Sequence, residues 1–146
     1  MYETPYSSSL ETRVHSATRL ELVVMLYDGA LEAVESARGH LAGGRIKERS
    51  LAITKAAEIL NELSQSLDCA PGDELSVRLA SLYTYMRGLL LDANIRQADE
   101  GLAETESLLK TLREGWAEIA QRRAENVFVA EPPAAGATQS RYSWTA

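Results

Sequence analysis

The sequence predicts an all-α protein that folds as an antiparallel, up-and-down four-helix bundle. Over four stretches, about residues 18–41, 45–68, 73–95 and 99–123, apolar residues recur at three- and four-residue steps, the spacing of one helix face. Short links join these stretches, and short links favour antiparallel neighbours in a bundle. No segment alternates apolar and polar residues with a period of two, so we expect no strand. The bundle domain should therefore span residues 18–124.

The first helix is expected over residues 18–41. Thr18 is followed three residues later by Glu21, which predicts a capping box: the threonine oxygen accepts from free backbone N–H groups and the glutamate reaches back to the cap. Its apolar face is formed by Leu20, Val23, Val24, Tyr27, Leu31, Val34 and Leu41. Gly43 and Gly44 then break the helix, because glycine readily adopts the conformations that end one.

The second helix, about residues 45–68, is followed by a stop at Pro71 and Gly72, since proline cannot continue the hydrogen-bond ladder. The third, about residues 73–95, starts with Asp73 in its first turn, where a negative charge is favourable. The fourth, about residues 99–123, has Asp99 as its expected N-cap. It also has the most regular apolar spacing in the chain, made by Leu102, Thr105, Leu109, Leu112, Trp116 and Ile119.

The two ends of the chain lack this regular spacing. Pro5 and the serines at 7–9 disfavour a helix, so residues 1–17 are expected to form a non-helical N-terminal arm, either disordered or folded back onto the domain. Residues 125–146, with paired prolines and many small residues, predict a disordered tail. Tyr142 and Trp144 in that tail are either a short contact motif or part of plain disorder.

Composition limits the class of protein. The chain of 146 residues has 15 basic and 21 acidic side chains, a net charge of -6, which argues against nucleic-acid binding and against docking on anionic membranes. Its single cysteine suits a reducing compartment. No apolar run has the length of a signal peptide or a membrane helix. We therefore expect a cytoplasmic protein without membrane insertion.

The sequence offers no arrangement typical of an active site. His15 lies in the polar arm and His40 beside the glycine break, neither being the exposed mid-helix position that a phosphotransfer bundle needs. A di-metal carboxylate bundle needs a Glu-x-x-His step on two helices, and the chain has none. Cys69 has no paired histidine. We expect no catalysis, no cofactor and no bound metal.

Several separated motifs nevertheless resemble one known family. LYDGAL at 26–31, SLD at 66–68, LYTYMRGLLLDANI at 82–95 and LLKTLREGW at 108–116 closely resemble the flagellin-export chaperones, the FliS family, as does the opening Met1-Tyr2 with Tyr6. The likeness covers about residues 1–123, in order. It departs from the family pattern at Arg19, where proline is frequent, and at 71–73, where paired glycines are frequent.

The resemblance implies a function that residue spacing alone could not give. A member of this family would be a cytosolic export chaperone that binds the disordered C-terminal segment of flagellin and prevents premature polymerisation. The segment would become helical and wrap around the bundle, which would help present flagellin to the export-gate platform of the flagellar secretion apparatus. Some relatives also hold an anti-sigma factor. We expect a monomer or weak homodimer.

The helices carry more apolar positions than one packing seam absorbs, which suits recognition of an amphipathic helix in a groove. From this surplus we predict a flagellin-binding groove lined by Tyr6, Ile53, Ala56, Leu60, Leu63, Leu79, Tyr83, Met86 and Leu109. We further predict that the N-terminal arm covers this groove until flagellin displaces it, through Tyr2, Tyr6 and Leu10. The residues that carry the family resemblance are interpreted as determinants of the fold: Tyr27, Asp28, Gly29, Asn94 and Trp116.

Two other functions remain open at this stage. The first is a generic helical-bundle adaptor or regulatory protein that binds another amphipathic helix. The second is a homo-oligomeric structural bundle with no client. Trp116 is interpreted as a core anchor before a ligand contact, because large aromatic side chains at helical spacing usually pack inside. Asn94 is interpreted as a structural cap near the end of its helix.

Overall fold

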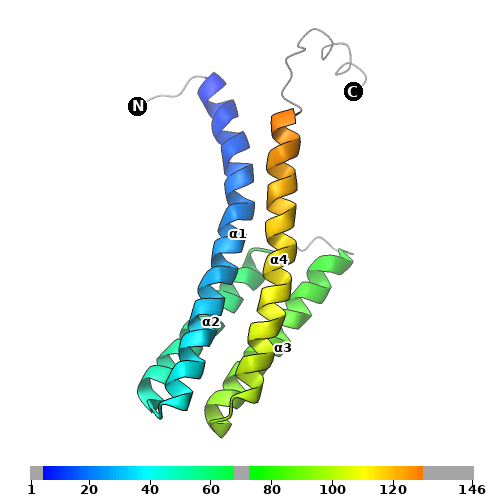
Figure 1. The fold of residues 1–146 in the computed structure, drawn as a ribbon. Coiled ribbons are helices and arrows are strands. Elements are labelled where there is room, and N and C mark those ends of the chain that lie inside the picture. Colours follow the sequence, from blue (N-terminus) through cyan, green and yellow to red (C-terminus); the bar gives the residue numbers. More distant parts are fainter. Residues whose placement is uncertain (1–4, 68–72, 130–146) are drawn as a thin grey trace.

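The computed structural model describes residues 5–67 and 73–129, and side chains over 19–67 and 73–125. Within this part of the chain every regular element is a helix: α1 is Pro5–Ala42, α2 Ile46–Gln65, α3 Glu74–Arg96 and α4 Glu100–Val129. Each helix packs on its neighbours in sequence, and α4 packs back on α1, whereas the backbones of the diagonal pairs do not approach closely within the described residues. The four-helix bundle predicted from the sequence is confirmed (Figure 1).

The two outer helices in sequence are longer than the two inner ones. α1 has 38 residues and α4 has 30, against 20 for α2 and 23 for α3. All four reach the same lower end, so α1 and α4 run on side by side beyond the point where α2 ends and α3 begins (Figure 1). The bundle therefore has four helices at one end and only two at the other.

The N-terminal boundary differs from the prediction. We expected a non-helical arm over residues 1–17, but α1 begins at Pro5 and continues along one axis through the expected start at Thr18. Proline is tolerated in the first turn of a helix, where its missing N–H has no partner to lose. Residues 5–17 therefore extend α1 away from the bundle and do not fold back over it. Tyr2 lies outside the described residues.

The C-terminal boundary also moves outward. α4 continues to Val129, six residues past the predicted end at 123, and so takes in the first residues of the predicted tail. In the sequence Pro132 follows three residues later, and helical geometry is disfavoured for the residue before a proline. The remainder of the predicted tail, residues 130–146, lies outside the described part.

The links between helices use the predicted residue types. Gly44 has a φ of +70° in the turn between α1 and α2, a conformation that glycine adopts without strain. At the start of α3, Asp73 caps the helix by accepting from the Ser76 backbone N–H and from the Ser76 hydroxyl, the latter at 2.9 Å. Asp99 directly precedes α4 as predicted, and its carbonyl accepts from the Ala103 backbone N–H at 2.9 Å. Its carboxylate, however, accepts two hydrogen bonds from Arg38 of α1 at 2.8 and 2.7 Å.

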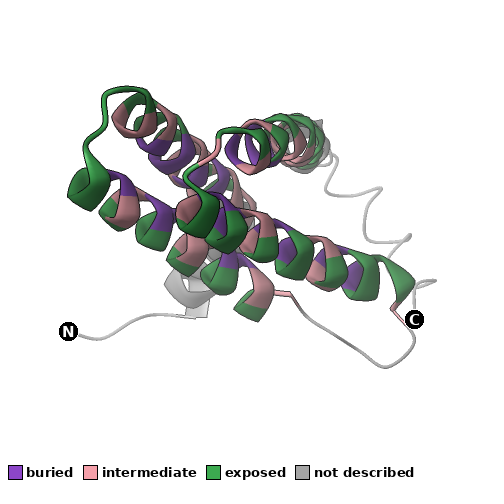
Figure 2. Ribbon diagram, turned by 90° about the horizontal axis from the view of Figure 1, so that it is seen from below, coloured by how far each residue is buried: buried purple, intermediate pink, exposed green. Residues whose placement is uncertain are grey.

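The core lies along the bundle axis, on the faces that the helices turn toward one another (Figure 2). Tyr27, Leu60, Tyr83 and Met86 are fully buried in it. Gly29 lets α2 approach α1, since a Cβ there would lie 3.3 Å from Ile59 Cδ1. The free energy of folding should come mainly from this apolar burial, at about 25 cal/mol per Å².

Polar contacts hold the helix pairs in register around the core. Arg113 of α4 donates to Asp28 of α1 at 2.6 Å. Between α2 and α3, the buried Arg49 donates to the Asn94 side-chain oxygen at 3.0 Å, and the same oxygen accepts from the Ser50 hydroxyl at 3.2 Å. Asn94 thus ties α3 to α2, so it does not act as the helix cap that we expected.

Candidate functional site: an open groove at the two-helix end

A groove of about 780 Å³ lies where α2 and α3 end against the continuing α1 and α4. We call it the end groove. Its apolar lining consists of Leu20, Leu22, Val23 and Leu26 of α1, Leu67 after α2, Leu75 and Leu79 of α3, and Trp116 of α4. Its polar lining consists of Arg19, Glu62, Gln65, Ser66, Asp73, Ser76 and Arg123. All four helices or their ends therefore contribute to this one site.

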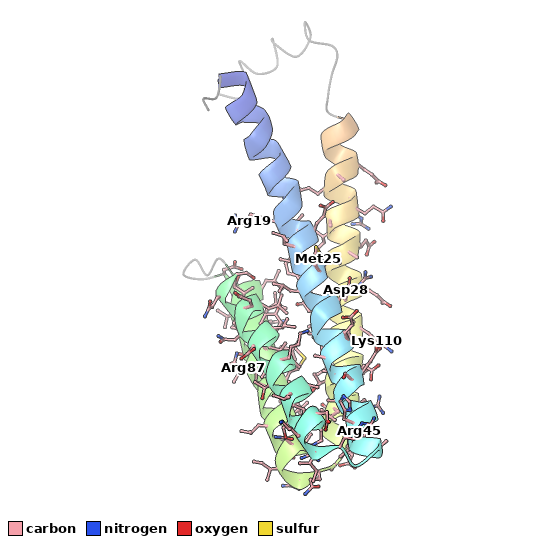
Figure 3. The ribbon with its side chains drawn as sticks, turned by 90° about the vertical axis from the view of Figure 1, so that its left-hand side faces the viewer. Arg19, Met25, Asp28, Arg45, Arg87 and Lys110 are labelled. Carbon is pink, nitrogen blue, oxygen red and sulfur yellow. The ribbon has the colours of Figure 1, made fainter. Side chains whose placement is uncertain are left out.

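The end groove exists because the helices differ in length. Lower in the bundle, α1 packs on α2 and α4 packs on α3, but α1 and α4 continue past the last turn of α2 and the first turn of α3 (Figure 1). Leu22 is left 49% exposed and Leu75 63% exposed. Arg19 extends from α1 on the side of α2 and α3, near their ends (Figure 3). Exposed apolar side chains gathered in a concave surface are typical of a binding site.

Beneath the end groove, three aromatic side chains form a hydrogen-bonded chain into the core. The Trp116 indole N–H donates to the Tyr27 hydroxyl at 3.1 Å, and the Tyr27 and Tyr83 hydroxyls bond to each other. The two tyrosine rings lie 6.4 Å apart at their centres. Burial raises the pKa of both tyrosines, so both stay neutral and keep their protons for these bonds. Trp116 is thus held in one orientation by a partner inside the core.

The chemistry of the lining favours an amphipathic peptide as the ligand. Two arginines and two carboxylates balance each other around an apolar floor, which is unlike the dense positive charge that phosphate backbones require. A helical peptide inserts side chains at three- and four-residue steps into such a groove. Over the described residues, no group of histidine, cysteine and acidic side chains has the arrangement to hold a metal ion. No described helix is long and apolar enough to cross a membrane.

Residues 2–123 of the chain match the model of the family described as "Flagellar protein FliS". The chain belongs to this family. It is 37% identical to the flagellar secretion chaperone FliS of Salmonella typhimurium over 115 residues. This match covers 78% of the present chain and 85% of the relative. It is 30% identical over 119 residues to the flagellar secretion chaperone FliS of Bacillus subtilis, covering 82% and 88%. The resemblance seen in the sequence motifs is confirmed.

In this FliS family member, most of the predicted groove residues lie elsewhere. Leu79 lines the end groove, although only 8% of it is exposed. Seven others are at most 5% exposed and form the core: Ile53, Ala56, Leu60, Leu63, Tyr83, Met86 and Leu109. The prediction is corrected accordingly, because the most regular apolar stripes of α2 and α3 face the bundle axis. Tyr6 and Leu10 lie in the first turns of α1, where the structure does not describe side chains.

Sequence reasoning missed most of the residues that do line the end groove. Leu22, Leu67 and Leu75 fall within the predicted helices but are not assigned to a site there, and Trp116 is interpreted as a core anchor. A usable signal was present: Leu22 falls off the main apolar stripe of its helix, where an exposed leucine needs another partner. Trp116 has both properties, since its ring lines the end groove and its N–H reaches the core.

Proposed function

We propose that this chain is an export chaperone for flagellin. In this proposal it binds the disordered C-terminal segment of flagellin in the cytosol, prevents its premature polymerisation and helps deliver it to the flagellar secretion apparatus. The observation that carries the proposal is the end groove, an open apolar site of about 780 Å³ in a chain of the FliS family. The curated relatives named above, flagellar secretion chaperones, support the same reading.

Binding would proceed by coupled folding of the client. A disordered segment that forms a helix on the chaperone places its apolar side chains in the end groove, between Leu22 on α1 and Leu75 on α3. Ordering such a segment costs about 2–5 kcal/mol or more, which lowers the net affinity and makes release possible without energy input. The proposed role is therefore binding and release, with no chemical step.

Handover to the export-gate platform requires a second surface. While the client fills the end groove, the platform has to contact another part of the bundle or the client itself. We place that contact away from the two-helix end, so that delivery and client binding do not compete. A ternary mixture in which the platform's cytosolic domain displaced the client from the end groove would contradict this part of the proposal.

The test is a titration of the full chain with a peptide that copies about forty C-terminal residues of flagellin, followed by calorimetry and circular dichroism. We expect one peptide per chain and a gain of helix on mixing. Leu22→Ser and Leu75→Ser should each weaken binding about tenfold or more, because burying one leucine contributes about 1.5–3 kcal/mol. An unrelated amphipathic peptide should bind more weakly, whereas equal binding would favour a generic adaptor.

The chain offers matched controls for both substitutions. Met25→Ser on α1 and Val77→Ser on α3 remove side chains that are 62% and 58% exposed but do not line the end groove. These controls should leave the affinity within about twofold, since exposed substitutions away from a site change little. If the controls weaken binding as much as the groove variants do, the client lies on another face.

A further inference from the structure

α4 lines the end groove and also carries the chain away from it. Trp116 and Arg123 contribute to the groove, and the helix ends at Val129, one to two turns beyond Arg123. The sequence continues for residues 130–146, which include Pro132-Pro133, Arg141, Tyr142 and Trp144. We propose that this segment binds in the end groove of its own chain through Tyr142 and Trp144, and competes there with the client. This competition rests on the proposed function, whereas the docking itself does not.

The segment is long enough to reach the end groove. From Val129 back to Trp116 the helix axis measures about 20 Å, at 1.5 Å per residue. The 13 residues from Val129 to Tyr142 span about 40 Å even in a polyproline-like conformation of 3.1 Å per residue. Pro132 and Pro133 prevent continuation of α4 and so allow the chain to change direction. Tyr142 and Trp144 can therefore return to the level of Leu22 and Leu75.

The chemistry of segment and groove is complementary. A tyrosine and a tryptophan each bury about 150–250 Å² and keep a polar group for solvent or a rim partner, which suits a half-open apolar groove. Between them and the end of α4 the sequence is mainly small and neutral. Arg141, next to Tyr142, can meet the carboxylates of Glu62 and Asp73 at the groove rim. The groove needs cover, because Leu22 and Leu75 are otherwise left in water.

Tethering makes weak docking sufficient. A short flexible link gives an effective concentration of about 1 mM, so an intrinsic dissociation constant of about 0.1–1 mM fills the groove in half or more of the molecules. A client that must displace the segment then binds about two- to tenfold more weakly than it would to an open groove. Such a segment shields the groove before flagellin arrives and still yields to a client with micromolar affinity.

The first measurement uses methyl NMR spectra of the full chain and of its double variant Tyr142→Ser with Trp144→Ser. We expect shifts of the groove methyls of Leu22, Val23 and Leu75, and none at Ile46 and Leu51 on the opposite half of α2. The control variant Thr138→Ala with Gln139→Ala, in the same segment, should leave all of them in place. Unchanged groove methyls in the aromatic variant would overturn the proposal. Shifts that disappear on tenfold dilution would also overturn it, because the segment would then belong to a second copy.

The second measurement is the affinity of both variants for the flagellin C-terminal peptide. We expect the aromatic variant to bind about two- to tenfold more tightly than the wild-type chain, and the control variant to bind equally. Groove shifts without a gain in affinity would overturn the proposed competition and show that the client binds outside the end groove, which contradicts the binding site given under the proposed function. Absence of groove shifts, with client binding that still depends on Leu22 and Leu75, would remove only the docking of the segment.

Discussion

The hydroxyl of Tyr27 has two partners in a fully buried place. It accepts from Trp116 and bonds to Tyr83, so it joins the end groove to the centre of the core. Removing it leaves the Trp116 N–H without that acceptor and the Tyr83 hydroxyl without that partner. A buried polar group that loses its hydrogen bond costs about 1–3 kcal/mol. This single oxygen therefore contributes to stability and to the orientation of the groove floor.

We predict that Tyr27→Phe lowers the free energy of unfolding by about 1–3 kcal/mol in urea titrations at neutral pH. The matched control is Tyr85→Phe. Tyr85 is 48% exposed and donates to Glu104 at 2.5 Å on the surface, where water competes for the bond, so its loss should cost less. Equal losses of unfolding free energy for the two variants would show that the buried hydrogen bonds stabilise the fold no more than the exposed one.

The same network gives a pH dependence with a definite sign. Burial raises the pKa of Tyr27 and Tyr83 above the ordinary value of about 10, so in this range the folded chain holds protons that the unfolded chain releases. Stability from this source is complete below pH 10 and falls as the pH rises above it. The urea midpoint should therefore drop more steeply between pH 9.5 and 11 in the wild-type chain than in Tyr27→Phe with Tyr83→Phe.

At the scale of the elements, the close approach of α3 and α4 depends on one glycine. A Cβ at Gly101, in the first turn of α4, would lie 2.8 Å from the Leu89 carbonyl oxygen of α3. That neighbour is backbone and cannot move aside as a side chain could. Gly115, on the same helix, is exposed and has open space around its would-be Cβ. Replacing each glycine by alanine therefore separates the effect of backbone packing, at Gly101, from the effect of helix propensity, at Gly115, on stability.

We predict that Gly101→Ala destabilises the bundle by about 1–3 kcal/mol, because overpacking forces the two backbones apart. Gly115→Ala should stabilise it by about 0.5–1 kcal/mol, since alanine is the better helix former where space allows. Thermal unfolding followed by circular dichroism measures both. A rise in melting temperature for Gly101→Ala, like that expected for Gly115→Ala, would show that the α3 and α4 backbones are not in tight contact at this position.

The helices themselves could largely be predicted from the sequence, but their exact lengths could not. Gly43-Gly44 and Pro71-Gly72 interrupt a helix whatever packs around them. The number and order of the helices could therefore be predicted from local sequence. The start of α1 at Pro5 could not be fixed in the same way. Proline stops a helix in its interior but opens one in its first turn, and the residues around Pro5 do not decide between these roles.

Because helix lengths could not be predicted, the sequence-based groove was assigned mostly to residues that lie in the core. Regularly spaced apolar residues such as Ile53, Leu60 and Met86 predict burial. All three are buried in the core, so they are not available to line an open groove. The end groove arises from a mismatch in length between helix pairs, which is a property of the assembled bundle. Leu22 and Leu75 line the groove because α2 ends while α1 continues, and this difference can be read only from the assembled bundle.

At the scale of the whole molecule, the bundle has a closed half and an open half. The four-helix half holds the core and the polar ties between helices, and the two-helix end exposes the groove at Leu22, Leu75 and Trp116. A client that binds at the open end can leave without unpacking the core. Under the proposed function, this division would allow a small FliS family chain to combine a stable fold with reversible binding.

The location of the client tests this account most directly. A photo-cross-linking residue placed at position 22 or 75 of the full chain, then irradiated with the flagellin C-terminal peptide, reports which surface the peptide covers. Position 25, which is also exposed on α1 but lies outside the end groove, is the control. We predict cross-links from positions 22 and 75 and little or none from position 25. Strong cross-linking at 25 with none at 22 and 75 would contradict it.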